Sequence, residues 1–271
     1  MARSKNAQIS VELFDDIVAA QNLDAATAWK AIAELLLSCQ IWNSGGWSDF
    51  RDVVVFRESN DFKIGSAVMS RAEQLSQVLA TQLAIPRAQL CSRIGKYWKL
   101  SQMRTVQPHN PVGHAYRSLL VRALQKFGDP LLTYEEEVDP MVVYPGNIFS
   151  TRSKKPKIDI LVRRLARPVA LISSRWRFRH DRVDVVDEAI AYTPAARRQN
   201  PKSRFYVWVG EFDPSRLIKV LDHCPPVQPH AAIDAAVHFN PTLISQGLGV
   251  NGRISHLKDL NWLIQESFKW S

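Results

Sequence analysis

The segment KIDILVRRLARPVALISSRWRFRHDRVDVVDEAIAY, residues 157–192, decides the fold of this chain. It opens with a short strand of alternating apolar and polar residues around Asp159, and a turn follows at residues 166–168. A longer apolar strand is predicted over 169–178, and a helix begins at Asp184. Two antiparallel strands followed by a helix therefore form the centre of the predicted architecture.

Polar side chains share one face of these two strands. Because side chains alternate along a strand, Asp159 and Arg163 lie on one face of the first strand, and Ser173 and Arg175 on one face of the second. A hairpin register that sets Asp159 opposite Ser173 brings the two sets together. Glu188 follows about one turn into the helix. The sequence thus predicts a site with two carboxylates, a hydroxyl and a cation.

Positive charge is concentrated in the same region. The chain has a formal net charge of +9, and residues 152–204 contain fifteen Lys/Arg against five Asp/Glu. The rest of the protein is therefore near neutral. A single cationic segment on a neutral body is typical of a protein that binds a polyanion. The alternative is a solvated basic face without a partner.

Composition places the chain among ordinary globular proteins. Its 271 residues are enough for one large domain or two modest ones. No apolar run reaches the roughly 18–20 residues that a membrane span requires, and the N-terminus lacks the apolar core of a secretion signal. The three cysteines, Cys39, Cys91 and Cys224, are widely separated and lack metal-ligand spacing. We expect buried free thiols, a cytoplasmic location and no membrane partner.

The order of predicted elements indicates an α/β fold, a mixed β-sheet flanked by helices, preceded by an all-helical N-terminal domain. Pro108 and Pro111 mark a boundary between a helical domain over 1–106 and an α/β domain over 107–271. A buried, parallel strand is expected at 205–209. The other expected elements are helices at 9–20, 24–40, 113–127, 184–192, 214–221 and 256–270, a helix from Ser70, a strand at 131–138, and loops at 139–157 and 193–203.

Residues 77–100 have helix–turn–helix character. Pro86 suits the first position of the second helix, and Arg87, Arg93 and Lys96 then lie on or near a groove-facing helix. The turn contains no Gly. A plain αα-hairpin packed within a helical domain is the commoner alternative.

Acids at strand ends beside a cation suit the hydrolysis of a phosphodiester. Carboxylates hold Mg²⁺, which lowers the pKa of a bound water and neutralises charge on the phosphate. Asp159 and Glu188 are the expected ligands of that ion, and a neighbouring cation stabilises the charge of the transition state. The alternative for Asp159 is an ordinary salt bridge to Lys157 or Arg163, although an acid within an apolar strand costs desolvation.

This pattern resembles type II restriction endonucleases of the PD-(D/E)xK nuclease superfamily. The resemblance covers residues 110–225 and is carried by Asp159, Ser173-Ser174-Arg175 and Arg179-His180-Asp181-Arg182. In one branch of that superfamily the motif reads Asp…Ser-x-Lys, the second acid is a Glu on the following helix, and an Arg-x-Asp-Arg segment reads G·C base pairs in the major groove. Glu188 takes the place of that acid. The EFDPSRL run, residues 211–217, is also similar to such enzymes.

The resemblance implies a restriction-endonuclease-like fold and Mg²⁺-dependent hydrolysis of double-stranded DNA at a short, palindromic site that contains G·C pairs. It implies a homodimer, because both strands of such a site are cut, and no small-molecule cofactor. The implied catalytic residues are Asp159, Ser173, Arg175 and Glu188, with Asp159 and Glu188 as metal ligands. Base or phosphate contacts fall on Lys154, Lys155, Arg177, Arg179, His180, Asp181, Arg182, Arg197 and Arg198, with further phosphate contacts at Lys202 and Arg204.

Two departures from the family pattern bear on activity. Arg175 stands where the family has its catalytic Lys, and a guanidinium keeps its proton, so it cannot act as a base. The helix at 113–127 lacks the Glu that assists the metal in this family, and Glu135 or Glu137 is the expected substitute. The alternatives are therefore a DNA-binding protein on a nuclease scaffold that does not cleave, and a helix–turn–helix regulator driven by residues 77–100.

Overall fold

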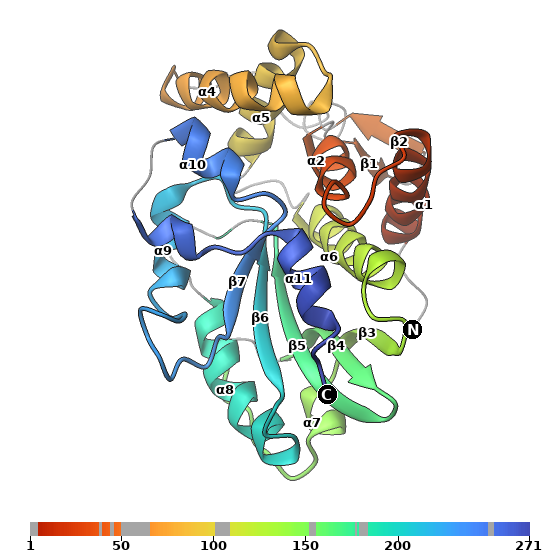
Figure 1. Cartoon of the computed structure of the whole chain (residues 1–271), viewed down its shortest axis with the longest axis vertical. Coiled ribbons are helices and arrows are strands. Elements are labelled where there is room, and N and C mark those ends of the chain that lie inside the picture. Colours follow the sequence, from red (N-terminus) through yellow and green to blue (C-terminus); the bar gives the residue numbers. More distant parts are fainter. Residues whose placement is uncertain are drawn as a thin grey trace. The chain divides into compact units, whose positions relative to one another are not determined.

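The computed structural model describes residues 5–37, 40–43, 46–49, 66–100, 109–151, 156–176, 178, 184–248 and 252–271. Its described residues form two compact units (Figure 1). The sheet unit comprises those in 120–241 and 252–271, and the helical unit those in 5–119 and 242–248. This division differs from the expected boundary at residues 106–107, because it falls within a helix and because a C-terminal segment joins the helical unit.

Five strands form the sheet of the first unit, in the order β3-β4-β5-β6-β7. β3 (Leu132–Val138), β4 (Ile158–Arg164) and β5 (Arg167–Arg175) are antiparallel neighbours. β6 (Arg204–Val209) and β7 (Ala235–His238) continue the sheet in parallel with β5. The predicted mixed sheet is confirmed. β7 was not predicted, because its four residues are all buried and give no alternating pattern.

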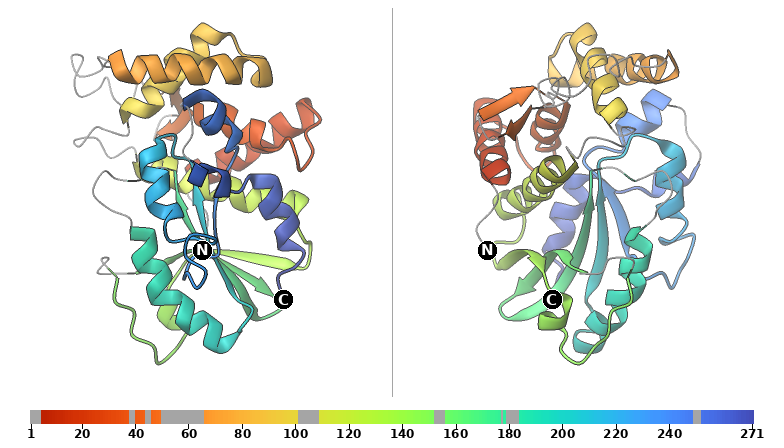
Figure 2. Two further views of the ribbon diagram at one scale, coloured as in Figure 1. Left: turned by 60° about the vertical axis from the view of Figure 1, so that its left-hand side comes forward. Right: turned by 180° about the vertical axis from the view of Figure 1, so that it is seen from behind.

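Helices cover both faces of this sheet (Figure 2). α8 (Asp184–Gln199) and α9 (Pro214–Leu221) lie on one face, and α11 (Leu260–Ser267) lies on the other. The predicted helix at 214–221 is confirmed, and Asp213 caps it by accepting a hydrogen bond from Ser215 N at 3.0 Å. The unit also contains the short helix α7 (Pro140–Val143) within the expected loop and the 3-10 helix η1 (Gly252–His256).

The parallel strand β6 forms the centre of the core. Its residues from Phe205 to Val209 are all buried, as predicted for a parallel strand. The Tyr206 ring packs against Trp262 of α11, and its hydroxyl accepts a hydrogen bond at 3.0 Å from Nε1 of Trp270, which follows that helix. Burying a large apolar side chain contributes about 1.5–3 kcal/mol, so this strand anchors the sheet on which the polar residues lie.

The β4–β5 hairpin turns at residues 165–166, slightly before the predicted turn at 166–168, and β5 ends at Arg175. The ladder shifts by one residue at Arg163, which pairs with Pro168, so that Val169 is an extra residue in β5. Proline has no N–H to donate, and within sheets it is found at such bulges. Alternation along the sequence takes no account of this extra residue, and the predicted turn therefore begins one residue too late.

The register beyond this bulge aligns the polar residues of the two strands. Ile160 pairs with Ile172, and the same register continued by one residue sets Asp159 opposite Ser173, as predicted. Because a slip of one residue moves every side chain to the other face, the bulge determines that Asp159 meets Ser173 rather than Ile172.

Helix α8 continues past its predicted end at residue 192. It runs to Gln199 with Pro194 inside it, so the expected loop at 193–203 is largely helical. A proline inside a helix removes one hydrogen bond. The packed face of α8 outweighs that cost, because buried residues recur at helical spacing through the proline: Ala189, Tyr192, Thr193 and Ala196.

The helical unit contains one element of a different kind, an antiparallel hairpin of two short strands. The expected all-helical N-terminal domain is corrected in this respect. Residues 84–86 connect two long helices that pack on each other, which fits both a helix–turn–helix and an αα-hairpin. The elements are α1 (Lys5–Ala20), α2 (Trp29–Leu37), β1 (Gln40–Asn43), β2 (Gly46–Asp49), α4 (Ser66–Leu83), α5 (Arg87–Leu100), the first part of α6 (His109–Phe127) and α10 (Thr242–Leu248).

Two further expectations concern membrane-spanning helices and cysteines. None of the helices in the described ranges is long and apolar enough to cross a membrane. Cys224 is a buried free thiol, as expected, whereas Cys91 is a free thiol that is only half-buried. Cys39 lies outside the described residues.

Candidate active site

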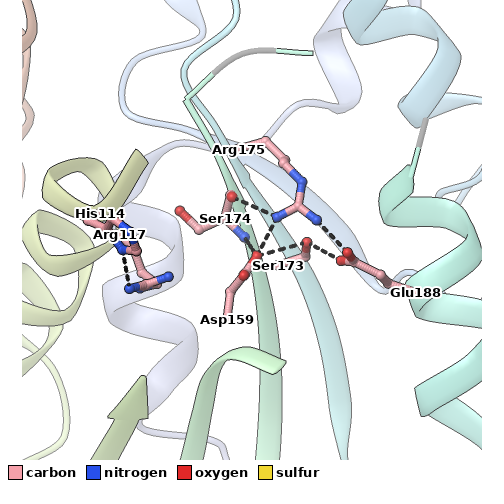
Figure 3. Close-up of polar contacts among 7 residues, drawn as sticks. All are labelled: His114, Arg117, Asp159, Ser173, Ser174, Arg175 and Glu188. Carbon is pink, nitrogen blue, oxygen red and sulfur yellow. Dashed lines mark hydrogen bonds and ion pairs between the residues drawn. The ribbon is translucent and has the colours of Figure 1, made fainter. Parts of the chain in front are cut away.

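Four polar side chains from three elements of the sheet unit meet at one place (Figure 3): Asp159, Ser173, Arg175 and Glu188. We call these four residues the acid–arginine cluster. Asp159 lies at the start of β4, Ser173 and Arg175 lie at the end of β5, and Glu188 lies near the start of α8. The predicted convergence of these residues is therefore found.

Arg175 binds both acids of the cluster at once. Its Nη1 donates to Asp159 Oδ2, and its Nη2 donates to Glu188 Oε1. Nη1 also donates to the carbonyl oxygen of Ser174 at 2.9 Å. The carbonyl oxygen of Arg175 accepts a hydrogen bond from Gly210 N at 3.0 Å. The guanidinium is thus fixed between two carboxylates and tied to its own strand.

The end of β5 also positions both acids directly. Ser173 Oγ donates to Glu188 Oε2 at 2.7 Å and lies 3.4 Å from Asp159 Oδ2. Ser174 N donates to Asp159 Oδ2 at 2.8 Å. The Ser174 hydroxyl, by contrast, is buried and has no hydrogen-bond partner within the described part of the chain. Ser173 therefore has a direct role in the geometry of the cluster, whereas Ser174 contributes its backbone.

Burial and the close charges determine the ionisation of the cluster. The side chains of Arg175, Asp159 and Glu188 are 25%, 18% and 17% exposed. Burial raises the pKa of Glu188 to about 7, Arg175 opposes that shift and Asp159 adds to it. Burial by itself disfavours the charged guanidinium, but Asp159 and Glu188 outweigh it and raise the pKa of Arg175 above its usual range. Arg175 consequently stays protonated.

The donor atoms of the cluster suit a hard divalent cation in type and number. Mg²⁺ usually takes one or two carboxylates from a protein and keeps several waters, and Asp159 and Glu188 are two such groups. The described residues contain no group of three or more His, Cys, Asp or Glu side chains that would hold an ion. Asp159 Oδ2 and both oxygens of Glu188 accept hydrogen bonds from β5. An ion bound to these oxygens would therefore compete with Arg175.

The two acids expected to substitute for a missing metal ligand have other partners. Glu135 Oε1 accepts a hydrogen bond from Arg163 Nε at 2.5 Å. Glu137 Oε2 lies 3.9 Å from Lys157 Nζ, and Glu137 has a positive φ of 55°, which interrupts the regular alternation of β3. The expectation that Glu135 or Glu137 assists the metal stays a prediction.

The residues expected to contact DNA separate into two groups. Arg197 and Arg198, at the end of α8, and Arg204, at the start of β6, are described. Arg204 pairs with Ala170, whereas Arg175 pairs with Val209 five residues further along the strand. The described cations thus lie at the opposite end of the parallel strands from the cluster. Outside the described residues lie Lys154, Lys155, Arg177, Arg179, His180, Asp181 and Arg182, and their contacts stay predictions.

Several cations of the basic segment have polar or acidic partners within the sheet unit. Arg197 and Arg204 both bind Asp234 at 3.0 Å. Arg198 donates to Asn147 Oδ1, and Arg164 pairs with Asp129. Because Asp234 and Asp129 lie outside residues 152–204, the positive excess in space is smaller than the excess counted along the sequence. The structure does not bring Arg197 and Arg198 to the cluster.

A buried ion pair that the sequence reasoning missed holds the chain just after β5. Glu211 is only 3% exposed, and its Oε2 accepts from Phe178 N and from Arg216 Nη1, both at 3.2 Å. Arg216 Nη1 also donates to the carbonyl oxygen of Phe178 at 3.1 Å. Burial raises the pKa of Glu211, and Arg216 opposes that shift. This pair fixes the backbone of Phe178, directly before residues 179–182.

The sequence did contain a signal for this pair. An acid directly follows the buried strand β6, and an arginine lies five residues later, on the helix that Asp213 caps. A carboxylate at the end of an apolar strand requires a partner. From the sequence, residues 211–217 indicate the end of a strand, the start of a helix and a part of the family resemblance, but no ion pair.

Comparisons with known proteins add little to this geometry. No protein-family model matches the chain, and no curated protein matches it. Among solved structures, the chain is similar to a restriction endonuclease PspGI–substrate DNA complex, with 13% identity, a TM-score of 0.40, and coverage of 98% of this chain and 95% of that chain. Identity and TM-score are both low, so the functional conclusion rests on the acid–arginine cluster.

Proposed function

We propose that this chain binds duplex DNA and hydrolyses its phosphodiester bonds at specific sites in an Mg²⁺-dependent reaction, as type II restriction endonucleases do. One observation carries the proposal: Asp159 and Glu188, from separate elements, meet at the guanidinium of Arg175. Asp159 and Glu188 would hold the metal ion. When bound, Mg²⁺ supplies an activated water and positive charge for the phosphate.

The other residues of the site have separate roles in catalysis and in DNA recognition. Arg175 is always protonated, so it stabilises negative charge that develops on the phosphate and takes no part as a base. Ser173 orients Glu188 through its hydroxyl. Arg179, Asp181 and Arg182 read base edges in the major groove, where arginine pairs with guanine and a carboxylate accepts from cytosine.

A second function is favoured by the same arginine. Because Arg175 already pairs with both Asp159 and Glu188, a metal ion must compete with the guanidinium for these acids. A protein that keeps this pairing binds specific DNA without cutting it. The two functions differ only in whether the wild-type chain cleaves.

The test is cleavage of supercoiled plasmid DNA by the full chain, with Mg²⁺ or with EDTA. We expect nicked and linear products with Mg²⁺ alone. Asp159→Asn and Glu188→Gln should each slow cleavage by about a hundredfold or more, the usual loss when one preorganised electrostatic group is removed. Asp187→Asn, one residue from Glu188 on α8, is the matched control and should cleave like the wild type.

The results separate the two functions. Cleavage that survives both Asp159→Asn and Glu188→Gln contradicts the assignment of the cluster. A wild-type chain that binds duplex DNA without cutting it, together with an Arg175→Lys variant that does cut, establishes the second function.

A further inference from the structure

The position of Arg175 has a consequence for how the cluster treats metal ions. One guanidinium contacts both acids, and both acids are more than four-fifths buried. In such a site each carboxylate needs a compensating charge, because an unpaired buried charge is costly. Arg175 supplies one positive charge from within the chain and shares it between the two acids.

We propose that Arg175 is the internal counter-ion of the cluster: it competes with the divalent ion for Asp159 and Glu188, and it lets the chain bind duplex DNA without any divalent metal. This inference rests on the proposed DNA-binding function. Two uncompensated carboxylates repel an approaching phosphate, and a bound metal ion relieves that repulsion. Here the guanidinium removes most of that repulsion beforehand.

The geometry explains why an arginine, and not a lysine, performs this role. Nη1 and Nη2 of Arg175 reach different acids, and Nη1 is also held by the carbonyl oxygen of Ser174. The planar fork of a guanidinium allows such simultaneous contacts, whereas an ammonium is a compact point charge on a flexible stem. An Arg175→Lys variant therefore neutralises the acids less completely and gives way to a metal ion more easily.

The first experiment measures metal binding without DNA. The midpoint of thermal unfolding is followed against Mg²⁺ and Mn²⁺ concentration for the wild type, Arg175→Ala and Arg175→Lys, because an ion that binds only the folded state raises that midpoint. We expect apparent affinity to increase about tenfold or more in Arg175→Ala and less in Arg175→Lys, since the metal no longer displaces a paired cation. Arg253→Ala, which removes an ion pair with Asp222 outside the cluster, is the control and should match the wild type. The inference is overturned if Arg175→Ala binds the metal ion no more tightly than the wild type does, or if Arg175→Lys binds it no more tightly.

The second experiment measures DNA binding by fluorescence anisotropy, using a pool of random duplexes with EDTA or with Ca²⁺. We expect the Kd of the wild type to differ by less than about threefold between the two conditions, since Arg175 already compensates part of the negative charge that Ca²⁺ would otherwise offset. Arg175→Ala should bind about tenfold or more weakly in EDTA and recover with Ca²⁺. The wild-type measurement alone decides the inference if Arg175→Ala does not fold.

The possible failures are distinguishable. A wild-type chain that binds duplex DNA only with a divalent ion overturns the inference and leaves the proposed function intact. A wild-type chain that binds no duplex in either condition overturns the proposed function, and the DNA-binding part of the inference with it.

Discussion

At the scale of single residues, the acid–arginine cluster depends on a side chain that cannot lose its charge. Arg175 contacts Asp159 and Glu188 together, and its pKa is raised by them. Removing one partner of a buried ion pair typically costs about 3–5 kcal/mol, whereas the intact pair adds little net stability. The arrangement is thus better explained by function than by stability.

A buried histidine elsewhere in the sheet unit gives a pH prediction. Burial lowers the pKa of His238 from 6.5 to about 3. Between those values the unfolded chain takes up a proton at this position and the folded chain does not. Stability therefore falls as the pH drops below about 6.5, by about 1.4 kcal/mol per pH unit.

The measurement is urea unfolding of the wild type and His238→Asn near neutral pH and at about pH 5, where this group alone predicts a loss of about 2 kcal/mol. Asparagine keeps an acceptor for Asn240 N, which donates to His238 Nδ1 at 3.0 Å. The wild type should lose more stability on acidification than the variant. An identical pH dependence in both proteins would rule out this account of His238.

The basic residues that are expected to contact DNA give a prediction about base preference. Arg179→Ala and Arg182→Ala should each weaken binding to the preferred site by about 1–3 kcal/mol and relax the preference for one base pair. Lys154→Ala should weaken binding evenly across sequences, since a phosphate contact carries no sequence information. Affinities for a selected site and its single-base variants test both. A selective loss in the Lys154 variant would contradict its assignment to a phosphate.

The sequence predicted the residues of the cluster because each follows a simple rule. Alternation gave the faces of the two strands, and a helix after β5 gave Glu188. Alternation did not reveal that the guanidinium of Arg175 would bind both acids at once. That contact depends on side-chain geometry in three dimensions, which no local pattern encodes.

At the scale of elements, the β4–β5 hairpin determines the site through a bulge. Val169 is an extra residue beside Pro168, and the resulting register sets Asp159 opposite Ser173. The sequence predicted β6 and α9 because their signals are local, a buried run and a capped proline. It missed the full length of α8, because burial against the sheet outweighs the effect of Pro194 on the helix.

The Glu211–Arg216 pair gives a prediction about the connection after β5. Glu211→Ala should cost about 3–5 kcal/mol of unfolding free energy, because it removes the buried carboxylate that pairs with Arg216 and accepts from Phe178 N. Asp222→Ala, which removes an exposed pair with Arg253, is the control and should cost less than about 1 kcal/mol. Urea unfolding measures both. Equal losses in the two variants would show that Glu211 is not a structural anchor.

At the scale of the whole molecule, the proposed function requires two active sites, because a palindromic duplex site presents two strands. We predict a homodimer in solution or on DNA. Sedimentation velocity should give twice the chain mass of 30.8 kDa for the free protein, or that mass plus the mass of one duplex for the complex. A monomer that cleaves both strands in a single binding event would contradict this prediction.

The division into units could be predicted only in part. The proline-rich boundary near residue 108 indicated a change of architecture, but the helical unit also includes α10 from far along the chain. A contact between α10 and α4 joins segments that are more than 150 residues apart in sequence. Local composition carries no signal for such a pairing.

The proposed nuclease site consists of Asp159, Glu188 and the cation at residue 175. Its sharpest test is plasmid cleavage with Mg²⁺ by Arg175→Lys, compared with the double variant Arg175→Lys/Asp159→Asn. We expect the lysine variant to cleave at least as fast as the wild type and the double variant not to cleave. Two proteins that bind duplex DNA equally well and leave it uncut, or that cut it at the same rate, would contradict this assignment.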